Sequence, residues 1–295
     1  MSPQFTIIDS PSILGLRPTG VELLPDALKA AGLIEKLHAD YAGRVSTLLP
    51  YNSDLDKVTL LLNPNSIKTL SIQLADIVSS VIYSRRYPIV LGGDCSILIG
   101  NLLALRRLGR YGLFFIDGHA DFYQPEASLT GEVADMDLAI VSGRGPDILT
   151  NIDNLKPLVR DKDIILFGYR DREQASSFGS QDVRNTSINS FDLAYVKQRG
   201  IRTTATEAIK NILNDELFGF WIHLDADVLD DAIMPAVDYR LKGGLSFDEL
   251  SELLKIIVGT GRSVGMDITI FNPNLDPDGS IACRFVSAIV KGISS

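Results

Sequence analysis

The segment Asp117-Gly-His-Ala-Asp121 places two carboxylates and one imidazole at alternate positions of the chain. It follows Tyr111–Ile116, an apolar run with the length and the aromatic and β-branched residues of a buried strand. Side chains along an extended chain repeat with a period of two, so the three polar groups would point to one side. Carboxylate oxygen and imidazole nitrogen together suit a divalent cation such as Mn²⁺. A solvated polar loop is the alternative explanation of this segment taken alone.

A second apolar run ends in the same way. Gly219–Ile222 leads into His223, Asp225 and Asp227 at alternate positions. Carboxylates that crowd into a site of low dielectric constant repel each other unless a cation compensates their charge. A third run, the expected strand Pro88–Leu91, is followed by two glycines and then by a thiol, Cys95. Ligands of α/β proteins bind at the carboxyl ends of strands, which is where all of these groups would lie.

The composition excludes several classes of protein. The chain has 295 residues, a formal net charge of −9 and a pI of about 4.9. Nucleic acids and anionic membranes both require a basic surface, so neither is expected as a partner, whereas a small cationic substrate is compatible with this charge. The two cysteines, Cys95 and Cys283, give no disulfide framework. We find no signal peptide and no apolar run near the roughly 20 residues that span a bilayer, so we expect a cytoplasmic protein.

Strands and helices are expected to alternate along the whole chain, without a linker or a repeat. The expected strands include Pro88–Leu91, Tyr111–Ile116, Asp163–Gly168, Gly219–Asp225 and Arg262–Ile270. The expected helices include Leu24–Tyr41 (with a break at Gly32 as an alternative), Ser66–Arg86, Ser96–Leu108, Ser190–Gln198, Ala205–Leu217 and a helix that begins at Ser246, where Glu249 completes a capping box. This alternation predicts one α/β domain over residues 1–295 with a largely parallel sheet.

The three polar segments resemble the motifs of the ureohydrolase (arginase/agmatinase) family. That family carries Gly-Gly-Asp-His-Ser, Asp-Ala-His-x-Asp and Ser-x-Asp-x-Asp-x-x-Asp-Pro, which are similar, in the same order, to Gly92–Ser96, Asp117–Asp121 and His223–Asp231. The resemblance extends over almost the whole chain. It implies a single three-layer α/β/α domain around a mainly parallel eight-stranded sheet, and a hydrolase that cleaves the C–N bond of a guanidino group.

The resemblance also implies a pair of divalent cations, with manganese as the expected metal. One ion would be held by Cys95, Asp117, Asp121 and Asp225, and the other by Asp117, His119, Asp225 and Asp227. A hydroxide shared by the two ions would attack the guanidino carbon and release ornithine or another amine, together with urea or hydroxyurea. Members of the family generally form trimers or hexamers, so we expect a homo-oligomer.

Cys95 departs from the family pattern, which has histidine at that position. Its thiolate could bind the metal, the first metal could be weakened or absent, or the thiol could be buried without a role. Thiolate is a softer ligand than Mn²⁺ prefers, which leaves Zn²⁺, Co²⁺ and Fe²⁺ open. The same substitution marks the branch of the family that hydrolyses Nω-hydroxyarginine, and the chain resembles that branch more than urea-cycle arginase.

Two further departures concern groups that would act on the substrate. Ala134 matches the family's proton-shuttle histidine, and Ile270 matches the glutamate that faces the guanidinium. An arginine guanidinium stays charged, so burying it without a carboxylate reduces affinity. An N-hydroxyguanidine is less basic and should be tolerated better.

Other side chains are candidates for the missing catalytic groups. Glu132 and Asp135 lie in the loop that has lost the histidine, and either could act as a general acid, although ordinary loop carboxylates are an equal alternative. His223 shares a strand face with Asp225 and Asp227 but lies deeper, so it is either a catalyst or a histidine that supports the core and the neighbouring ligands.

Three residues match family positions that contact an amino-acid substrate. Tyr123 and Thr130 match contacts to the α-carboxylate, and Glu173 matches a contact to the α-amino group, with surface exposure as its alternative. The expected substrate is therefore Nω-hydroxyarginine, arginine or a related guanidino compound. Tyr123 would crowd a free amino acid, so a peptidyl arginine is an alternative substrate. A catalytically silent relative that serves as a partner subunit or ligand sensor is the alternative to an enzyme.

Overall fold

The computed structural model describes residues 4–45 and 50–294, and within them eight strands form one sheet. The strand order is β2-β1-β3-β8-β7-β4-β5-β6, and every neighbouring pair is parallel. The strands are β1 (Phe5–Asp9), β2 (Asp40–Arg44), β3 (Tyr87–Leu91), β4 (Gly112–Ile116), β5 (Ile164–Phe167), β6 (Asn189–Phe191), β7 (Phe220–Asp225) and β8 (Ser263–Thr269). The expected eight-stranded parallel sheet is confirmed.

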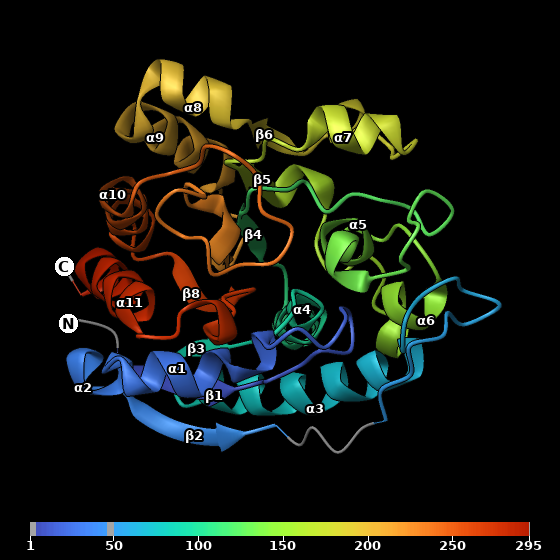
Figure 1. The fold of residues 1–295 in the computed structure, drawn as a ribbon, viewed down its shortest axis with the longest axis horizontal. Helices are drawn as coiled ribbons and strands as arrows, with labels where there is room; N and C mark the ends of the chain where they lie inside the picture. Colours follow the sequence, from blue (N-terminus) through green and yellow to red (C-terminus); the bar gives the residue numbers. More distant parts are fainter. Residues whose placement is uncertain (1–3, 46–49, 295) are drawn as a thin grey trace.

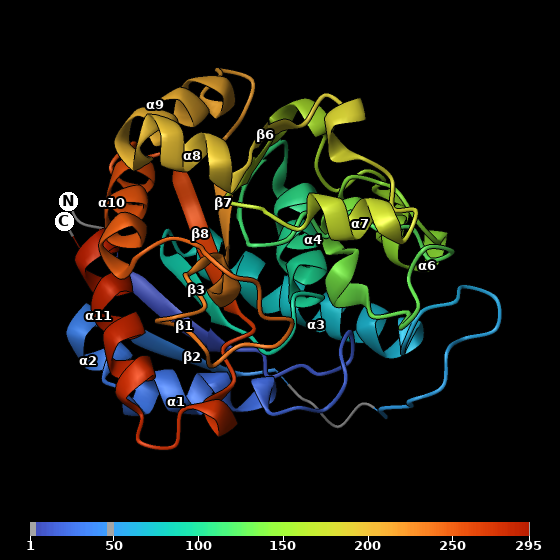
Figure 2. The same ribbon diagram turned by 45° about the horizontal axis from the view of Figure 1, so that its top comes forward.

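Helices cover both faces of the sheet, so the molecule has the three layers that the family resemblance implies (Figures 1 and 2). On one side lie α1 (Leu24–Ala30), α2 (Leu33–Leu37), α8 (Leu193–Arg199), α9 (Ile201–Ile212), α10 (Phe247–Val258) and α11 (Ser280–Ile293). On the other side lie α3 (Pro64–Tyr83), α4 (Ile97–Leu108), α5 (Asp137–Val141) and α6 (Asp147–Thr150). The short α7 (Arg172–Ser177) has no buried residue. No helix in the described part of the chain is long and apolar enough to cross a membrane.

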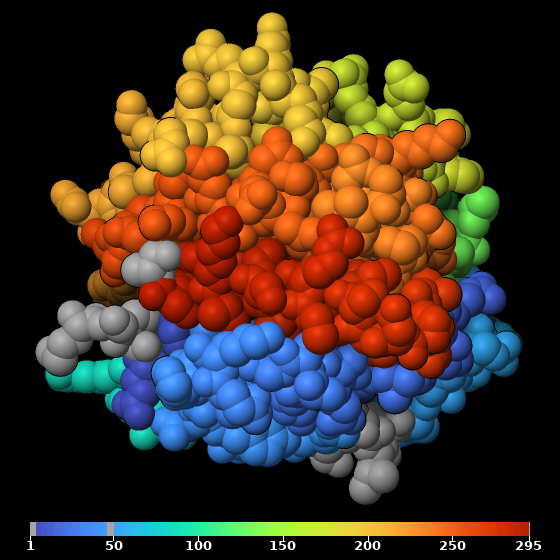
Figure 3. All heavy atoms as spheres, turned by 60° about the vertical axis from the view of Figure 1, so that its left-hand side comes forward, coloured from blue at the N-terminus to red at the C-terminus, as the bar shows by residue number. Residues whose placement is uncertain are grey.

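Alternate residues of each strand enter two separate hydrophobic cores. In β4, Phe114 belongs to the core under α8–α11, and Phe115 belongs to the core under α3–α6. In β7, Ile222 enters the first core and Trp221 the second. Strands that are buried on both faces are typical of a parallel sheet. Figure 3 shows the C-terminal segment, which contains α11, packed between the N-terminal helices and the segment that contains α10.

The capping box expected at Ser246 is present. The Ser246 Oγ accepts a hydrogen bond from the Glu249 N–H at 3.1 Å, and the Glu249 carboxylate accepts one from the Ser246 N–H at 2.7 Å. Two otherwise unpaired donors are thereby satisfied where α10 begins. The helix then continues to Val258.

Two of the expected helices differ from the structure. In Leu24–Tyr41 the alternative break at Gly32 (φ 87°) is confirmed, and the helical part ends earlier than expected, because His38 (φ 51°) is left-handed and β2 begins at Asp40. Ser190–Gln198 is also not one helix. Ser190 and Phe191 pair with β5 as part of β6, and α8 begins only after Asp192, whose side chain accepts a hydrogen bond from the Tyr195 N–H.

The strand order determines where the polar segments meet. The last two strands, β7 and β8, lie between β3 and β4. Cys95 follows β3, Asp117 follows β4 and Asp225 ends β7, so all three lie at the carboxyl edge of the central strands β3-β8-β7-β4. A sheet whose strand order changes direction in this way has a ligand-binding crevice at that edge.

Candidate metal centre

Four buried side chains from three strand ends form the deeper part of the site. One potential ligand atom from each of Cys95, Asp117, His223 and Asp225 lies within 4.8 Å of all the others. The Cys95 Sγ donates to the Asp225 carboxylate at 2.9 Å and lies 3.3 Å from the Thr269 Oγ1. Of this group, the Asp117 Oδ2 and the His223 Nε2 are buried and have no hydrogen-bond partner in the described residues. Buried polar atoms that face one another without hydrogen-bond partners are typical of a site that binds a cation.

A second group lies nearer the solvent and shares Asp117 with the first. Asp117, His119 and Asp227 each offer a ligand atom within 4.8 Å of the others. The His119 Nδ1 lies 2.8 Å from the Asp227 Oδ2. Backbone groups hold these side chains in place: the Gly118 N–H donates to Asp227 at 2.9 Å, and the Asp227 N–H donates to Asp225 at 2.7 Å.

The charges of the site are compatible with two cations. Burial, together with the neighbouring Asp227, raises the pKa of Asp225 well above its usual range. Burial, together with the Asp225 carboxylate, likewise raises the pKa of the Cys95 thiol. Burial alone would also raise the pKa of Asp117, but His119 and His223 lower it to about 2. Without a cation, this cluster must keep protons to remain buried, whereas two divalent ions would replace those protons. The donor set therefore fits a pair of divalent metals.

Asp121 lies in the same cavity but belongs to neither of the two groups formed by the described residues. It is buried, and its backbone is left-handed with a φ of 44°. Burial, together with the carboxylate of Asp117, raises its pKa well above the usual range. The other expected ligands all occur in the two groups: Cys95, Asp117 and Asp225 in the deeper one, and Asp117, His119 and Asp227 in the outer one. His223, which was not expected as a ligand, belongs to the deeper group.

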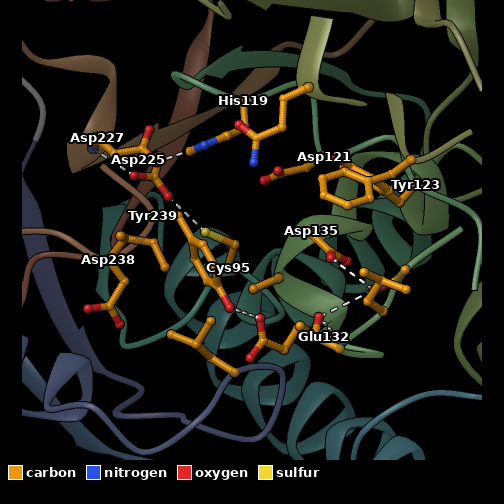
Figure 4. Close-up of a pocket in the computed structure, with 18 of the residues that line it drawn as sticks. Cys95, His119, Asp121, Tyr123, Glu132, Asp135, Asp225, Asp227, Asp238 and Tyr239 are labelled. Atoms are coloured by element: carbon orange, nitrogen blue, oxygen red, sulfur yellow. Dashed lines mark hydrogen bonds and ion pairs between the residues drawn. The ribbon is translucent and has the colours of Figure 1, made fainter. Parts of the chain in front are cut away.

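A cavity of about 210 Å³ opens above the two groups (Figure 4). His119, Asp225 and Asp227 lie at one end of it, and Tyr123 and Asp135 lie opposite. Much of the wall is apolar and comes from Leu16, Leu129, Ala134, Phe178 and Ile270. A concave site with a largely apolar lining and a few charged groups at its base is the usual form of a small-molecule site.

The structure brings some of the expected substrate contacts to this cavity and leaves one outside. Tyr123 and Thr130 line it. Glu173 is exposed on α7 and lines a separate surface hollow with Tyr169 and Asp192, whereas the next residue, Gln174, does line the cavity. Successive residues of a helix point in different directions, so an error of one residue in matching the sequence to the family moves the side chain out of the cavity.

Both candidate acids border the cavity. The Glu132 carboxylate accepts a hydrogen bond from the Tyr239 hydroxyl and lies 3.3 Å from the Arg17 guanidinium. Asp135 accepts from the Ser128 Oγ at 3.0 Å, and its Oδ1 is buried without a partner among the described residues. Burial raises the pKa of Asp135 to about 7, against the opposing effect of the Ser128 hydrogen bond.

Ala134 and Ile270, the matches to the missing histidine and glutamate, also face the cavity. Ile270 follows β8 with a φ of 67°, which is unusual for a β-branched residue. Its N–H donates to the Gly93 carbonyl at 2.8 Å, so the turn before Cys95 holds this conformation. The wall at this end of the cavity therefore carries a fixed aliphatic side chain.

The sequence did not reveal several other residues of the site. Asp137 is fully buried at the start of α5, and its Oδ2 has no partner in the described part of the chain. Asp238 and Tyr239 border the cavity from a loop after β7. An aspartate at the first turn of a helix is common, so Asp137 gives no signal in the sequence. Asp238 and Tyr239 become neighbours of the site only through the tertiary fold.

Comparison with known proteins identifies the family. The sequence profile of the arginase family matches residues 5–293. An arginase from Staphylococcus aureus is 29% identical over 293 residues, covering 96% of this chain and 94% of that protein. The crystal structure of arginase from Bacillus cereus is similar, with a TM-score of 0.87 and 25% identity, covering 99% of this chain and 98% of that one.

A more distant structure shares the fold. The proclavaminate amidinohydrolase of Streptomyces clavuligerus has a TM-score of 0.72 at 17% identity and covers 99% of this chain and 92% of that one. The family profile spans the segments that carry Cys95, Asp117 and Asp225, which the fold brings together at the base of one cavity. The chain belongs to the arginase family of ureohydrolases.

Proposed function

We propose that this protein hydrolyses the C–N bond of a guanidino group in a small molecule, with two divalent cations bound at the base of the cavity. The observation that carries the proposal is the convergence of two groups of potential metal ligands, which share Asp117, below a cavity of about 210 Å³. When bound, the two cations supply a nucleophile at neutral pH by lowering the pKa of water. Cys95, Asp117, Asp121 and Asp225 would hold one cation, and Asp117, His119, Asp225 and Asp227 the other.

The reaction adds water across the C–N bond. The oxygen of water becomes bonded to the guanidino carbon, the bond to the alkyl nitrogen breaks, and that nitrogen leaves as an amine after it has taken up a proton. The products are ornithine or another amine, and urea or hydroxyurea. The buried apolar side chains of Leu16, Ala134 and Ile270 would limit the access of other water to the reacting carbon.

Asp135 is the residue that we propose as the proton donor to the departing nitrogen. It faces the cavity from the position next to Ala134, where the family's shuttle histidine is missing. Its Oδ1 has no hydrogen-bond partner among the described residues, and its pKa of about 7 lets it hold a proton near neutral pH. Glu132 is the other candidate: its Oε2 accepts a hydrogen bond from Tyr239, and its Oε1, which has no hydrogen-bond partner among the described residues, lies 3.3 Å from the Arg17 guanidinium.

Nω-hydroxyarginine is the substrate that we propose in preference to arginine. Ile270 presents an aliphatic side chain where a glutamate would face the guanidinium, so a charged guanidinium would be buried there without a partner. The N-hydroxylated group is less basic and can enter with less charge. Tyr123 and Thr130 would contact the carboxylate end of the substrate.

The test is the release of ornithine by protein loaded with Mn²⁺, with arginine and Nω-hydroxyarginine as parallel substrates. We expect turnover of both, with a higher kcat/KM for the hydroxylated compound, and no turnover by Asp117→Asn. The matched control is Asp153→Asn, because Asp153 pairs with Arg107 at the protein surface. If the protein binds metal but hydrolyses neither compound, the result would point to another guanidino substrate. Absence of turnover in protein that binds no metal would favour the catalytically silent relative, which the loss of the groups at Ala134 and Ile270 also supports.

A further inference from the structure

We propose that His223 is a metal ligand of the deeper group and supplies the imidazole that position 95 lacks. The segment with Cys95 has cysteine where the family motif has histidine, and the segment with Asp225 has histidine, His223, where the motif has serine. Both side chains belong to the same group of four potential ligands. The imidazole would thus have moved from the loop after β3 to strand β7. This inference rests on the proposed metal-dependent function.

The register of the sheet fixes the position of His223. It pairs with Phe115 of β4 on one side and with Asp267 of β8 on the other. The rings of Phe115 and His223 stack with centroids 4.4 Å apart, and the histidine is fully buried. Its side chain projects from the same face of β7 as Asp225, which lies two residues later. His223 is therefore held beside the ligand group by the central strands of the sheet.

Asp267 determines which ring nitrogen faces the site. Its Oδ2 lies 2.5 Å from the His223 Nδ1, and its Oδ1 accepts hydrogen bonds from the Asn101 amide and the Trp221 indole. A carboxylate that receives two such donors on one oxygen accepts the Nδ1–H of the imidazole on the other. In the neutral imidazole, which metal binding requires, the Nε2 lone pair then faces Asp117 and Cys95. A metal-binding histidine characteristically donates its other nitrogen to a carboxylate in this way.

The atom that Nε2 faces also lacks a partner. The His223 Nε2 lies 3.7 Å from the Asp117 Oδ2, which is too far for a hydrogen bond. Both atoms are buried, and neither has a hydrogen-bond partner in the residues that the structure describes. A separation of 3.7 Å is compatible with both atoms binding one cation, since such bonds are about 2.0–2.2 Å long. A cation between them would satisfy both atoms at once.

The resulting donor set has a chemical preference. With His223 taking the place that the resemblance gives to Asp121, which lies outside this group, thiolate, imidazole and two carboxylates form a softer set than the oxygen-rich one that Mn²⁺ prefers. The deeper group should therefore select Zn²⁺, Co²⁺ or Fe²⁺ over Mn²⁺. The outer group, which has Asp117, His119 and Asp227, keeps a set of oxygen and nitrogen donors. We expect the two positions to differ in metal preference.

The direct test is NMR of protein labelled with ¹⁵N-histidine, because the chain contains only 3 histidines. The metal-free protein is titrated with Zn²⁺, and the signals are assigned with His38→Gln and His119→Gln. We expect the Nδ1–H tautomer at His223 and a large change in its Nε2 resonance when Zn²⁺ binds. The Nε2 resonance of the exposed His38 should not change. The wild-type measurement needs no substitution at His223, so misfolding of a variant cannot obscure it.

Co²⁺ binding gives a second, optical readout. Thiolate-to-cobalt absorption reports occupation of the deeper group, and Cys95→Ser should abolish it. Asp267→Asn removes the charge that orients His223 and should weaken this Co²⁺ affinity about 10- to 100-fold. The control Asp153→Asn should leave it unchanged. A variant with unchanged affinity would show that the Asp267–His223 pair does not support the metal.

The outcomes separate the two proposals. Two bound ions with an unchanged Nε2 resonance at His223 would overturn this inference and leave the proposed function intact. Protein that binds neither Zn²⁺, Co²⁺ nor Mn²⁺ would overturn both. A shift of the His223 signal together with the Cys95-dependent absorption would establish the relocated ligand.

Discussion

In the reaction that we propose, single residues would decide which guanidino compound is hydrolysed and how the proton is delivered. Asp135 combines a buried, unpartnered oxygen with a pKa of about 7 and lies beside the cavity. Ile270 presents an aliphatic surface to the same cavity. Ile270 is itself a departure from the family pattern and Asp135 lies next to another, Ala134, so the proposed activity can be tested most directly at these two side chains.

Replacement of Asp135 by asparagine should lower kcat about 100-fold, which is the lower end of the usual contribution of a general acid. In the wild type, kcat should fall as the pH rises above about 7, because the carboxyl group then loses the proton that it must donate. This alkaline limb should be absent in Asp135→Asn. Ser128→Ala removes a hydrogen bond that stabilises the ionised form, so the limb should move to higher pH. An unchanged pH–rate profile in Asp135→Asn would refute this role.

Replacement of Ile270 by glutamate should shift the specificity towards arginine. A carboxylate at this wall would pair with the guanidinium, and removal of the β-branch should also relax the backbone at φ 67°. We expect the ratio of kcat/KM for arginine to that for Nω-hydroxyarginine to rise at least about 10-fold, equivalent to about 1.4 kcal/mol. The neutral control Ile270→Gln should change the ratio much less. Equal ratios in both variants would show that charge at this position does not select the substrate.

At the scale of elements, the turn between β3 and α4 positions Cys95 and depends on close backbone contacts. A Cβ on Gly93 would lie 1.9 Å from the Ser12 carbonyl oxygen, which is backbone and cannot move aside cheaply. The neighbouring Asp94 accepts a hydrogen bond from the Ser12 hydroxyl at 2.8 Å, so the two loops are joined. The strand end and the first loop of the chain therefore form one support for the thiol.

Gly93→Ala should lower the free energy of unfolding by about 3 kcal/mol or more, because the two loops must separate. Gly179→Ala is the control: its added Cβ meets nothing within 4 Å, and only its φ of 78° is unfavourable. That variant should lose about 1 kcal/mol. The two values can be compared by urea unfolding monitored by the fluorescence of Trp221. A loss in Gly93→Ala no larger than that of the control would mean that the turn can relax.

Most helices and strands, and the meeting of the polar segments at one edge of the sheet, could be predicted from the sequence because they depend on local patterns. Apolar runs that end in alternating carboxylates identified β4 and β7, and the serine–glutamate spacing identified the start of α10. The short β6 was missed because its three residues, Asn189–Phe191, carry no alternating pattern. The contact of His223 with Asp267 could not be predicted because it requires β8 to be placed beside β7, which only the sheet order shows. The sequence left His223 open between two roles for the same reason.

At the scale of the whole molecule, the metal-free protein must bury several acidic side chains close together. Burial raises the pKa of Asp225 and Asp121 well above their usual range and that of Asp135 to about 7. Asp227 raises the pKa of His119 well above its usual value, against the opposing effect of burial. The folded state therefore keeps protons that the unfolded chain has already released. Stability falls with rising pH wherever the folded state binds more protons.

The Tm of the metal-free protein should therefore fall as the pH rises from about 4, where the carboxyl groups of the unfolded chain ionise, to about 7, where Asp135 titrates in the folded protein. With saturating Zn²⁺ the trend should reverse, because metal binding requires deprotonated ligands and becomes stronger as the pH rises. Scanning calorimetry with and without a chelator checks both signs. Parallel curves with and without metal would show that the ions do not bind at these groups.

The most direct measurement of the central claim is the number of divalent cations bound per chain in the wild type and in Asp117→Asn, by elemental analysis after dialysis. Asp117 belongs to both groups of ligands, so one substitution should affect both ions. We predict two ions in the wild type and in the surface control Asp153→Asn, and fewer than one in Asp117→Asn. A wild-type protein without bound metal, or an Asp117→Asn variant that still binds two ions, would contradict the dinuclear centre.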